Sequence, residues 1–200
     1  MKKIILIIGT LAIAATIYSL STENENPEEY IKLIEKERLK KDQTMSSGKD
    51  SPFGIYGDTT VKLSYYPVNP KYNLTAKIEL IETRQFLTLG SSDGNPVKYQ
   101  KYAYAKFKID DKPYQLLILK DPEVKNGGLF TAFVDETSAI ETYGAGRYLD
   151  LEFKRAKRIN LDFNKAYNPY CNYNDNYSCP FPPKDNQLPI RIEAGELIYH

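Results

Sequence analysis

From residue 52 onward, apolar and polar side chains alternate with a period of two. Such alternation is typical of strands with one face on a core and the other toward solvent. It predicts strands near 61–66, 74–80 and 97–109, and shorter apolar runs predict further strands at 114–119 and 129–134. In the longest stretch the expected inner face consists of Ala103, Ala105, Phe107 and Ile109.

Turn signals separate these runs, since Asn, Asp, Gly and Pro cluster at 69–70, 93–96, 110–113 and 126–128. Short strands at regular spacing between such turns favour an antiparallel β architecture. We therefore predict a mainly β fold, an antiparallel sandwich or small barrel, with residues 52–200 as a single β domain. The chain contains no internal repeat.

A helix is expected before the β domain. Asn26 can cap it, Pro27 suits its first turn, and Glu29 stands where a capping-box acid would. Residues 22–51 are thus predicted to form a linker and an amphipathic helix that ends near Lys41. The helix is either a stalk or docking helix, or an element packed on the edge of the β domain.

The N-terminus has the pattern of an export segment. Lys2 and Lys3 precede an apolar run at 4–20, and a weak cleavage site follows Ser21. Residues 1–21 are predicted to be a signal peptide or an N-terminal membrane anchor. No cysteine follows the run, which excludes a lipoprotein anchor. Both alternatives place the body outside the cytoplasm, periplasmic or secreted, or tethered to the inner membrane.

Composition narrows the possible functions. The formal net charge is +1, and this near-neutral balance argues against a nucleic-acid partner. The only histidine is His200, the last residue. Serine or cysteine catalysis with a histidine base would have to use this terminal residue, and a histidine-rich zinc site is excluded. We predict no cofactor and no metal, and whether the chain is an enzyme stays open.

The first unusual stretch is 142–149, where Gly144 and Gly146 flank Ala145 before Arg147. Glycine allows positive φ and close approach of the backbone, so this stretch can form an anion-binding nest beside Arg147. The alternative is a tight bend or bulge that leads into a strand, with Arg147 in a structural ion pair.

The second stretch, 162–183, is aperiodic and rich in Asn, Tyr and Pro, which predicts a long irregular C-terminal loop. Cys171 and Cys179 lie within it. Outside the cytoplasm they would form a disulfide, which contributes roughly 2–3 kcal/mol in the chain-entropy picture. The alternative is a reactive thiol at Cys171, with a pKa lowered by Arg147 or Lys165.

Several motifs together resemble the bacterial and archaeal family catalogued as domain of unknown function 1684. The similarity covers about residues 30–199 and is carried by Ser51-Pro52-Phe53, Tyr65-Tyr66-Pro67, Asp135-Glu136-Thr137, 141–149, Leu161-Asp162-Phe163-Asn164, 166–169, the Cys171…Cys179-Pro180 pair, Pro182-Pro183, Asn186 and Ala194-Gly195-Glu196. The resemblance implies a family without an assigned activity, so no catalytic residue is carried over. Members of such a family can lack an export segment, so the predicted disulfide depends on this chain's own N-terminus.

Three functions are compatible with these residues. The first is an extracytoplasmic ligand-binding or envelope-associated module whose loops recognise a carbohydrate, a peptide or a small polar ligand. Its candidate residues are Tyr143, Gly144, Gly146, Arg147, Asp162, Asn164, Asn168, Tyr170 and Glu196.

The alternative is a hydrolase in which Asp135, Asp162 or Glu196 serves as acid or base and Arg147 stabilises an anion. A third hypothesis is a calcium site built from Asp162, Asn164 and Asp175. Their spacing does not follow the EF-hand pattern.

Overall fold

The computed structural model describes residues 26–54, 60–122, 128–152 and 157–200. The predicted signal peptide or anchor at 1–21 lies outside these ranges. Within them, no helix combines the length and apolar character needed to span a membrane.

The elements in chain order are α2 (Pro27–Ser47), η2 (Pro70–Tyr72), β1 (Asn73–Leu89), β2 (Val97–Ile109), β3 (Lys112–Lys120), β4 (Leu129–Phe133), β5 (Arg147–Leu151), β6 (Arg158–Asp162), η3 (Phe163–Lys165), η4 (Tyr170–Asn172) and η5 (Lys184–Asn186).

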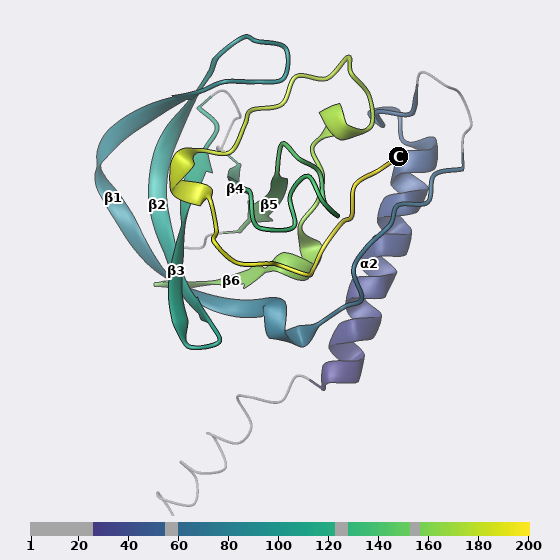
Figure 1. Cartoon of the computed structure of the whole chain (residues 1–200), viewed down its shortest axis with the longest axis horizontal. Helices are drawn as coiled ribbons and strands as arrows, with labels where there is room; N and C mark the ends of the chain where they lie inside the picture. Colours follow the sequence, from purple (N-terminus) through teal and green to yellow (C-terminus); the bar gives the residue numbers. More distant parts are fainter. Residues whose placement is uncertain (1–25, 55–59, 123–127, 153–156) are drawn as a thin grey trace, which may run out of the picture.

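The strands form one sheet in the order β5-β4-β3-β2-β1-β6, and every neighbouring pair is antiparallel. The sheet curls into a half-barrel, and the C-terminal segment passes through its concave side (Figure 1). The prediction of a mainly β, antiparallel fold with an N-terminal helix and an irregular C-terminal region is confirmed.

Strand β2 shows why alternation predicted the sheet. Its expected inner residues Ala103, Ala105, Phe107 and Ile109 are all buried, whereas Lys106 and Lys108 are exposed. The inner residues belong to the main core, to which β3 adds Leu116 and Ile118. Full burial of such a large apolar side chain contributes about 1.5–3 kcal/mol, so the sheet depends on this face.

Strand β1 differs from its prediction in length and pattern. It continues to Leu89, well past residue 80, and its pairing with β2 shifts between Leu80 and Gln85. Leu80, expected on the inner face, is 53% exposed. The irregular register turns the strand, and a shift in register changes which side chains face the core.

The segment 60–66 is extended but lies outside the sheet. Val61 and Leu63 are buried and their neighbours are exposed, as the alternation predicts. The backbone pairs with the C-terminal segment instead: Tyr66 N–H donates to Gly195 O (3.0 Å) and Leu197 N–H donates to Ser64 O (2.9 Å). The sequence pattern identified an extended, half-buried segment but not its partner.

Helix α2 starts at the predicted cap, since the Asn26 side chain accepts from Glu28 N–H (3.1 Å). It ends at Ser47 rather than near Lys41. Its last turns are stabilised by Met45, which is buried in a small cluster with Phe53, Val61, Leu63 and Tyr173. The helix thus packs on the body, and the segment 60–69 runs alongside it (Figure 1).

The C-terminal region is irregular, as predicted, but it is a packed part of the interior. Phe163, Leu188 and Ile192 belong to the main core. Asn186 is fully buried where β3 and β4 diverge, and its side-chain amide donates to Leu117 O (3.0 Å) and to Ala132 O (2.8 Å). Within the described residues, strands β3 and β4 pair through their backbones only at Leu119–Phe130 and Lys120–Leu129. Beyond these pairs, the side-chain amide of Asn186 takes the place of the missing backbone hydrogen bonds.

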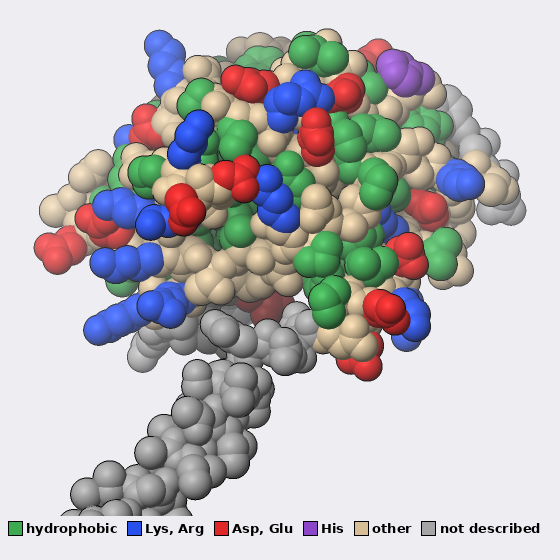
Figure 2. Space-filling model, turned by 60° about the horizontal axis from the view of Figure 1, so that its bottom comes forward, with side chains coloured by type: hydrophobic (Ala, Val, Ile, Leu, Met, Phe, Trp, Pro, Cys, Tyr) green, Lys and Arg blue, Asp and Glu red, His purple; other side chains and the backbone are tan. Residues whose placement is uncertain are grey.

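Acidic and basic side chains are interspersed over most of the face in Figure 2, in keeping with the balanced charge of the chain.

Candidate functional site

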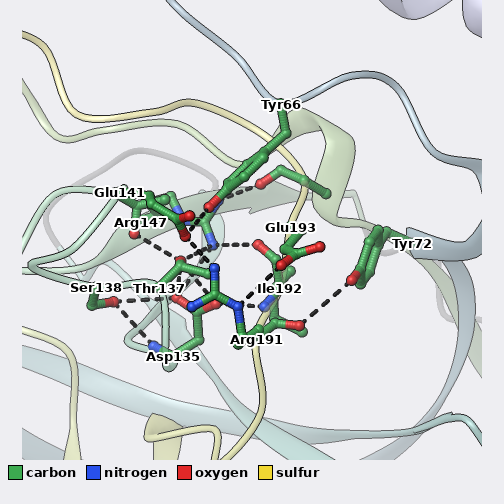
Figure 3. A network of polar contacts seen from close by, with 12 residues as sticks. Tyr66, Tyr72, Asp135, Thr137, Ser138, Glu141, Arg147, Arg191, Ile192 and Glu193 are labelled. Carbon is green, nitrogen blue, oxygen red and sulfur yellow. Dashed lines mark hydrogen bonds and ion pairs between the residues drawn. The ribbon is translucent and has the colours of Figure 1, made fainter.

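Arg147, the first residue of β5, is fully buried. Its guanidinium lies 3.3 Å from Asp135 Oδ1 and donates to the carbonyls of Ile192 (3.0 Å) and Ala194 (Figure 3). Burial lowers the pKa of Arg147, and the carboxylate of Asp135 opposes this effect. Arg147 thus joins the start of β5 to the C-terminal segment. Both of its terminal nitrogens bind protein oxygens, whereas its buried Nε has no hydrogen-bond partner among the described residues.

The carboxylate of Asp135 is equally occupied. It accepts from the hydroxyl of Thr137 (2.9 and 3.0 Å), from Ser138 (3.2 Å) and from Ile192 N–H (2.6 Å). Gly146, directly before Arg147, has φ +92°, and a Cβ there would lie 2.5 Å from Phe133 O. The stretch 142–149 therefore has the geometry of the predicted tight bend with a structural ion pair, while Gly144 is exposed.

Asp162 and Asn164 join β6 to helix α2. Asp162 Oδ1 accepts from Tyr30 OH (2.8 Å) and from Asn164 N–H (3.0 Å). The Asn164 amide donates to Asn69 O (2.9 Å) and its oxygen accepts from Asn69 N–H (2.9 Å). These oxygens have protein partners, and Asp175 of the calcium hypothesis is exposed. In the described ranges, no group of three or more His, Cys, Asp or Glu could hold a metal ion.

Glu196 is 1% exposed and binds groups from three parts of the chain. It accepts from Lys41 Nζ (2.5 Å), Tyr173 OH (2.5 Å) and Asn168 N–H (2.7 Å). The Asn168 amide in turn donates to Leu197 O (2.7 Å). Burial, and then the charge of Glu196, raises the pKa of Tyr173, so this phenol stays neutral and donates a hydrogen bond to the carboxylate.

The three acids of the hydrolase hypothesis do not meet in one site. Asp135, Asp162 and Glu196 are all buried, and each accepts from a different backbone N–H, of Ile192, Asn164 and Asn168. This is the arrangement of acids that organise loops, and no observation favours the hydrolase.

A cavity of about 200 Å³ lies between α2 and the C-terminal region, next to Asn164 and Glu196. Arg38, Lys41 and Tyr65 also line it. The Arg38 guanidinium donates to the carbonyls of Tyr66 (2.8 Å) and Asn164 (3.3 Å) and lies 4.5 Å from the Tyr65 ring centre. In the part of the chain that the structure describes, Arg38 Nε and Tyr65 Oη are buried without a hydrogen-bond partner.

A groove of about 530 Å³ adjoins this cavity and shares Lys41 and Tyr167 with it. The Lys41 ammonium lies 4.7 Å from the centre of the Tyr167 ring, at the boundary between them. Four tyrosines line the groove, among them the predicted Tyr170, which is 38% exposed. The tyrosines are Tyr148, Tyr167, Tyr170 and Tyr177. We call this space the tyrosine groove.

Both cysteines are buried free thiols, so a disulfide between them stays a prediction. Cys171 N–H donates to Cys179 Sγ (3.3 Å), and Tyr143 OH donates to Cys171 Sγ (3.7 Å). The expected basic neighbours of Cys171 do not take this role, since Arg147 binds Asp135 and Lys165 binds Glu37. The predicted candidate Tyr143 is therefore a neighbour of the thiols.

The structure thus divides the predicted residues into three groups. Arg147 and Gly146 belong to the buried bend, Asn164 and Glu196 line the cavity, and Tyr170 lines the tyrosine groove. Among the cavity residues that sequence reasoning missed are Arg38, Lys41 and Tyr65. The basic end of the helix and the Tyr65-Tyr66-Pro67 motif were visible, but nothing local indicated that they meet.

The comparison with known families agrees with the motif resemblance. A family model described as a protein of unknown function, DUF1684, matches residues 59–197. The chain belongs to this family. In this DUF1684 chain, the match includes Tyr65, Asn164 and Glu196 among the residues that line the cavity, whereas α2 with Arg38 and Lys41 precedes it.

The solution NMR structure of an uncharacterised protein from Haloarcula marismortui is similar to this DUF1684 chain. The sequences are 33% identical and the TM-score is 0.66, with 86% of this chain and 96% of that chain covered. The part of this chain that the NMR structure covers is longer than residues 59–197, which the family model matches, so the structural similarity extends beyond that range. No curated protein matches the chain.

Proposed function

We propose that the protein is an extracytoplasmic binding module that holds a small anionic ligand, such as a small carboxylate, in the cavity beneath α2. One observation carries this proposal: Arg38 and Tyr65 line the cavity, and the buried Arg38 Nε and Tyr65 Oη make no hydrogen bond of normal geometry with the described residues, although the Glu196 carboxylate lies near the Tyr65 hydroxyl. An unsatisfied buried polar group costs about 1–3 kcal/mol, so a molecule that accepts from these donors relieves that cost on binding.

The charges around the cavity favour an anion. Its two acids already have basic partners, since Glu196 binds Lys41 (2.5 Å) and Glu37 binds Lys165 (3.0 Å). Arg38 contacts carbonyls and the Tyr65 ring, and no described acid lies within ion-pair distance of it. The charged residues of the lining therefore sum to one positive charge, to which a single carboxylate can add charge-assisted hydrogen bonds. The acids Glu35 and Asp162, outside the lining, also act on Arg38 electrostatically.

The size of the cavity limits the ligand. A water molecule takes up about 30 Å³ of the liquid, so about 200 Å³ accommodates a molecule of a few heavy atoms or a small water cluster. Hydrogen-bonded water is the competing occupant, and it would satisfy the same two donors.

Replacing Tyr65 with phenylalanine distinguishes these occupants. In the absence of ligand, we expect Tyr65→Phe to change the melting temperature less than Tyr173→Phe does, because the Tyr65 hydroxyl lies near the Glu196 carboxylate without a hydrogen bond of normal geometry to it. We expect carboxylate binding to weaken by roughly tenfold or more, since a hydrogen bond to a charged group contributes about 1.5–3 kcal/mol. The measurements are thermal shift and calorimetric titration with acetate, lactate, pyruvate and inorganic phosphate, with glycerol as the neutral probe.

Tyr173→Phe is the matched control. It removes a buried phenol that donates to Glu196 (2.5 Å), so it should lower stability by about 1.5–3 kcal/mol and leave carboxylate binding intact. The proposal is wrong if no anion stabilises the wild-type protein saturably. It is also wrong if Tyr65→Phe binds the carboxylates as well as the wild type does, because water alone then occupies the cavity.

The extracytoplasmic location, with an envelope component as a further partner, is supported by Lys2, Lys3 and the apolar run at 4–20. We expect the expressed full chain to appear outside the cytoplasm on cell fractionation, with the N-terminus either intact in the membrane fraction or cut after Ser21. N-terminal sequencing of the purified protein distinguishes anchor from cleaved signal. Recovery of the intact chain in the cytoplasmic fraction would contradict the location.

A further inference from the structure

The two cysteines are held side by side by separate parts of the chain. The backbone of Cys179 is fixed by Ser92, whose Oγ accepts from Cys179 N–H (3.1 Å) and whose N–H donates to Cys179 O (3.1 Å). Cys171 lies in the short turn η4, and its N–H donates to Cys179 Sγ (3.3 Å). Both sulfurs are therefore positioned before any bond forms between them.

The polar groups at this pair favour a thiolate. The thiol of Cys179 donates to Cys171 and is the largest cause of a lowered Cys171 pKa, which is about 6 instead of 9.0. Tyr143, 3.7 Å from Cys171 Sγ, lowers it further, while burial acts in the opposite direction. The same contact raises the pKa of Cys179. The pair thus shares one proton over a wide pH range, as coupled groups do.

The pair also has access to solvent through the tyrosine groove. Cys179 lines this groove, together with Tyr148, Tyr170 and Tyr177. Although each cysteine is less than 10% exposed, the groove of about 530 Å³ leads to Cys179 and is large enough for a small molecule. A thiol that is buried only to pack the fold needs neither a coupled partner thiol nor a groove beside it, so these two features favour a reactive role for the pair.

We propose that Cys171 and Cys179 form a thiol–disulfide exchange site whose substrate is a small disulfide, or a cystine of a flexible peptide, bound in the tyrosine groove. The site goes beyond the proposed carboxylate binding and uses different reactive groups, although the tyrosine groove shares Lys41 and Tyr167 with the cavity. Tyrosine and proline side chains suit the aliphatic and amide surface of such a substrate.

The exchange takes place in two steps, each of which forms one S–S bond and breaks another. Cys179 passes its proton to the Cys171 thiolate and attacks one sulfur of the substrate RSSR. The substrate S–S bond breaks, and the leaving RS⁻ takes up the proton from Cys171. The Cys171 thiolate then attacks Cys179 Sγ of the mixed disulfide, and the second RS⁻ leaves. The singly deprotonated cysteine pair and one RSSR thus become one protein disulfide, one RSH and one RS⁻, with the substrate as the oxidant.

The test uses the full chain, reduced and then mixed with oxidised glutathione, with acid quenching and intact-mass detection. We expect the wild type to form the internal disulfide and to release both glutathione moieties. Cys171→Ser should accumulate the mixed disulfide on Cys179, because the resolving thiol is missing. Cys179→Ser should lose the rapid reaction, because it removes the cysteine that lines the groove.

The pH dependence gives a second readout in a variant that keeps both cysteines. The wild-type reaction rate should reach half its maximum below pH 9.0, because the coupled pair loses its first proton below the pKa of a free cysteine thiol. Tyr143→Phe removes a donor to the thiolate and should shift this midpoint upward. Tyr170→Phe is the matched control for the midpoint, because Tyr170 binds the sulfur of Cys179 through its backbone, which the substitution keeps, and the midpoint should not move.

Two results would overturn the proposal. In the first, the reduced pair reacts no faster than cysteines of the denatured chain, so the thiols are inert. In the second, the disulfide forms but excess reduced glutathione cannot open it in the folded protein, so it is a static cross-link of the 171–179 loop. Both results are read from the wild-type protein alone and do not depend on any variant folding.

Discussion

Arg147→Ala is expected to lower the free energy of unfolding by roughly 3–5 kcal/mol, the usual effect of removing one partner of a buried ion pair. The change leaves the buried carboxylate of Asp135 without its cation and removes the donors to Ile192 O and Ala194 O. Small domains are stable by about 5–15 kcal/mol in total, so much of the fold's stability is lost. Urea denaturation followed by circular dichroism measures the effect.

Arg191→Ala is the control for this prediction. Arg191 also pairs with carboxylates, those of Glu141 and Glu193, but its side chain is 38% exposed. Exposed pairs are screened by solvent, so we expect a much smaller change than for Arg147→Ala. If Arg147→Ala and Arg191→Ala had equal effects, Arg147 would not be structural. It would then be free for the anion that the sequence motif suggested.

Local patterns predicted those elements whose partners are near in sequence. The alternation in β2 identified the inner face because β3 follows directly after a short turn at Asp110 and Asp111. Strand β6 was missed, since its five residues are too few for a clear period. It pairs with the start of β1, more than 80 residues earlier. A local pattern in the sequence carries no information about pairing between residues that lie so far apart.

The candidate site likewise depends on contacts between distant segments, which local sequence patterns do not reveal. Asn164 and Glu196 were singled out from their motifs and do line the cavity, but Arg38 comes from a helix 126 residues before Asn164. The helix was predicted from its cap and its charges, which say nothing about the surface it covers. Its final turns depend on Met45, whose burial among Phe53 and Val61 is a tertiary effect.

The bend at 142–149 was recognised correctly as unusual, and both of its interpretations used the same glycines. An anion nest and a close backbone approach need the same conformational freedom, so residue type alone does not separate them. The structure distinguishes the two interpretations by the space around each glycine: Gly146 lies against Phe133 and Pro182, and Gly144 is exposed.

Gly146→Ala is therefore expected to lower the free energy of unfolding by roughly 3 kcal/mol. At φ +92° a Cβ would lie 2.5 Å from Phe133 O and 2.6 Å from Pro182 Cγ. Backbone strain of this kind costs about 1–3 kcal/mol, and overpacking adds about 1–3 kcal/mol. The strand β5 starts at the next residue, Arg147, so any shift that relieves the clash also displaces the buried ion pair. Urea denaturation measures this change too.

Gly144→Ala, two residues earlier, is the matched control. Its Cβ would lie 3.2 Å from the Cβ of Ala139, and the residue is exposed, so we expect a change within about 1 kcal/mol. A nest would respond differently, because both glycines would contribute to anion binding and neither substitution would unfold the chain. Equal, small effects of Gly144→Ala and Gly146→Ala on stability would contradict the close-approach role of Gly146 and support a nest.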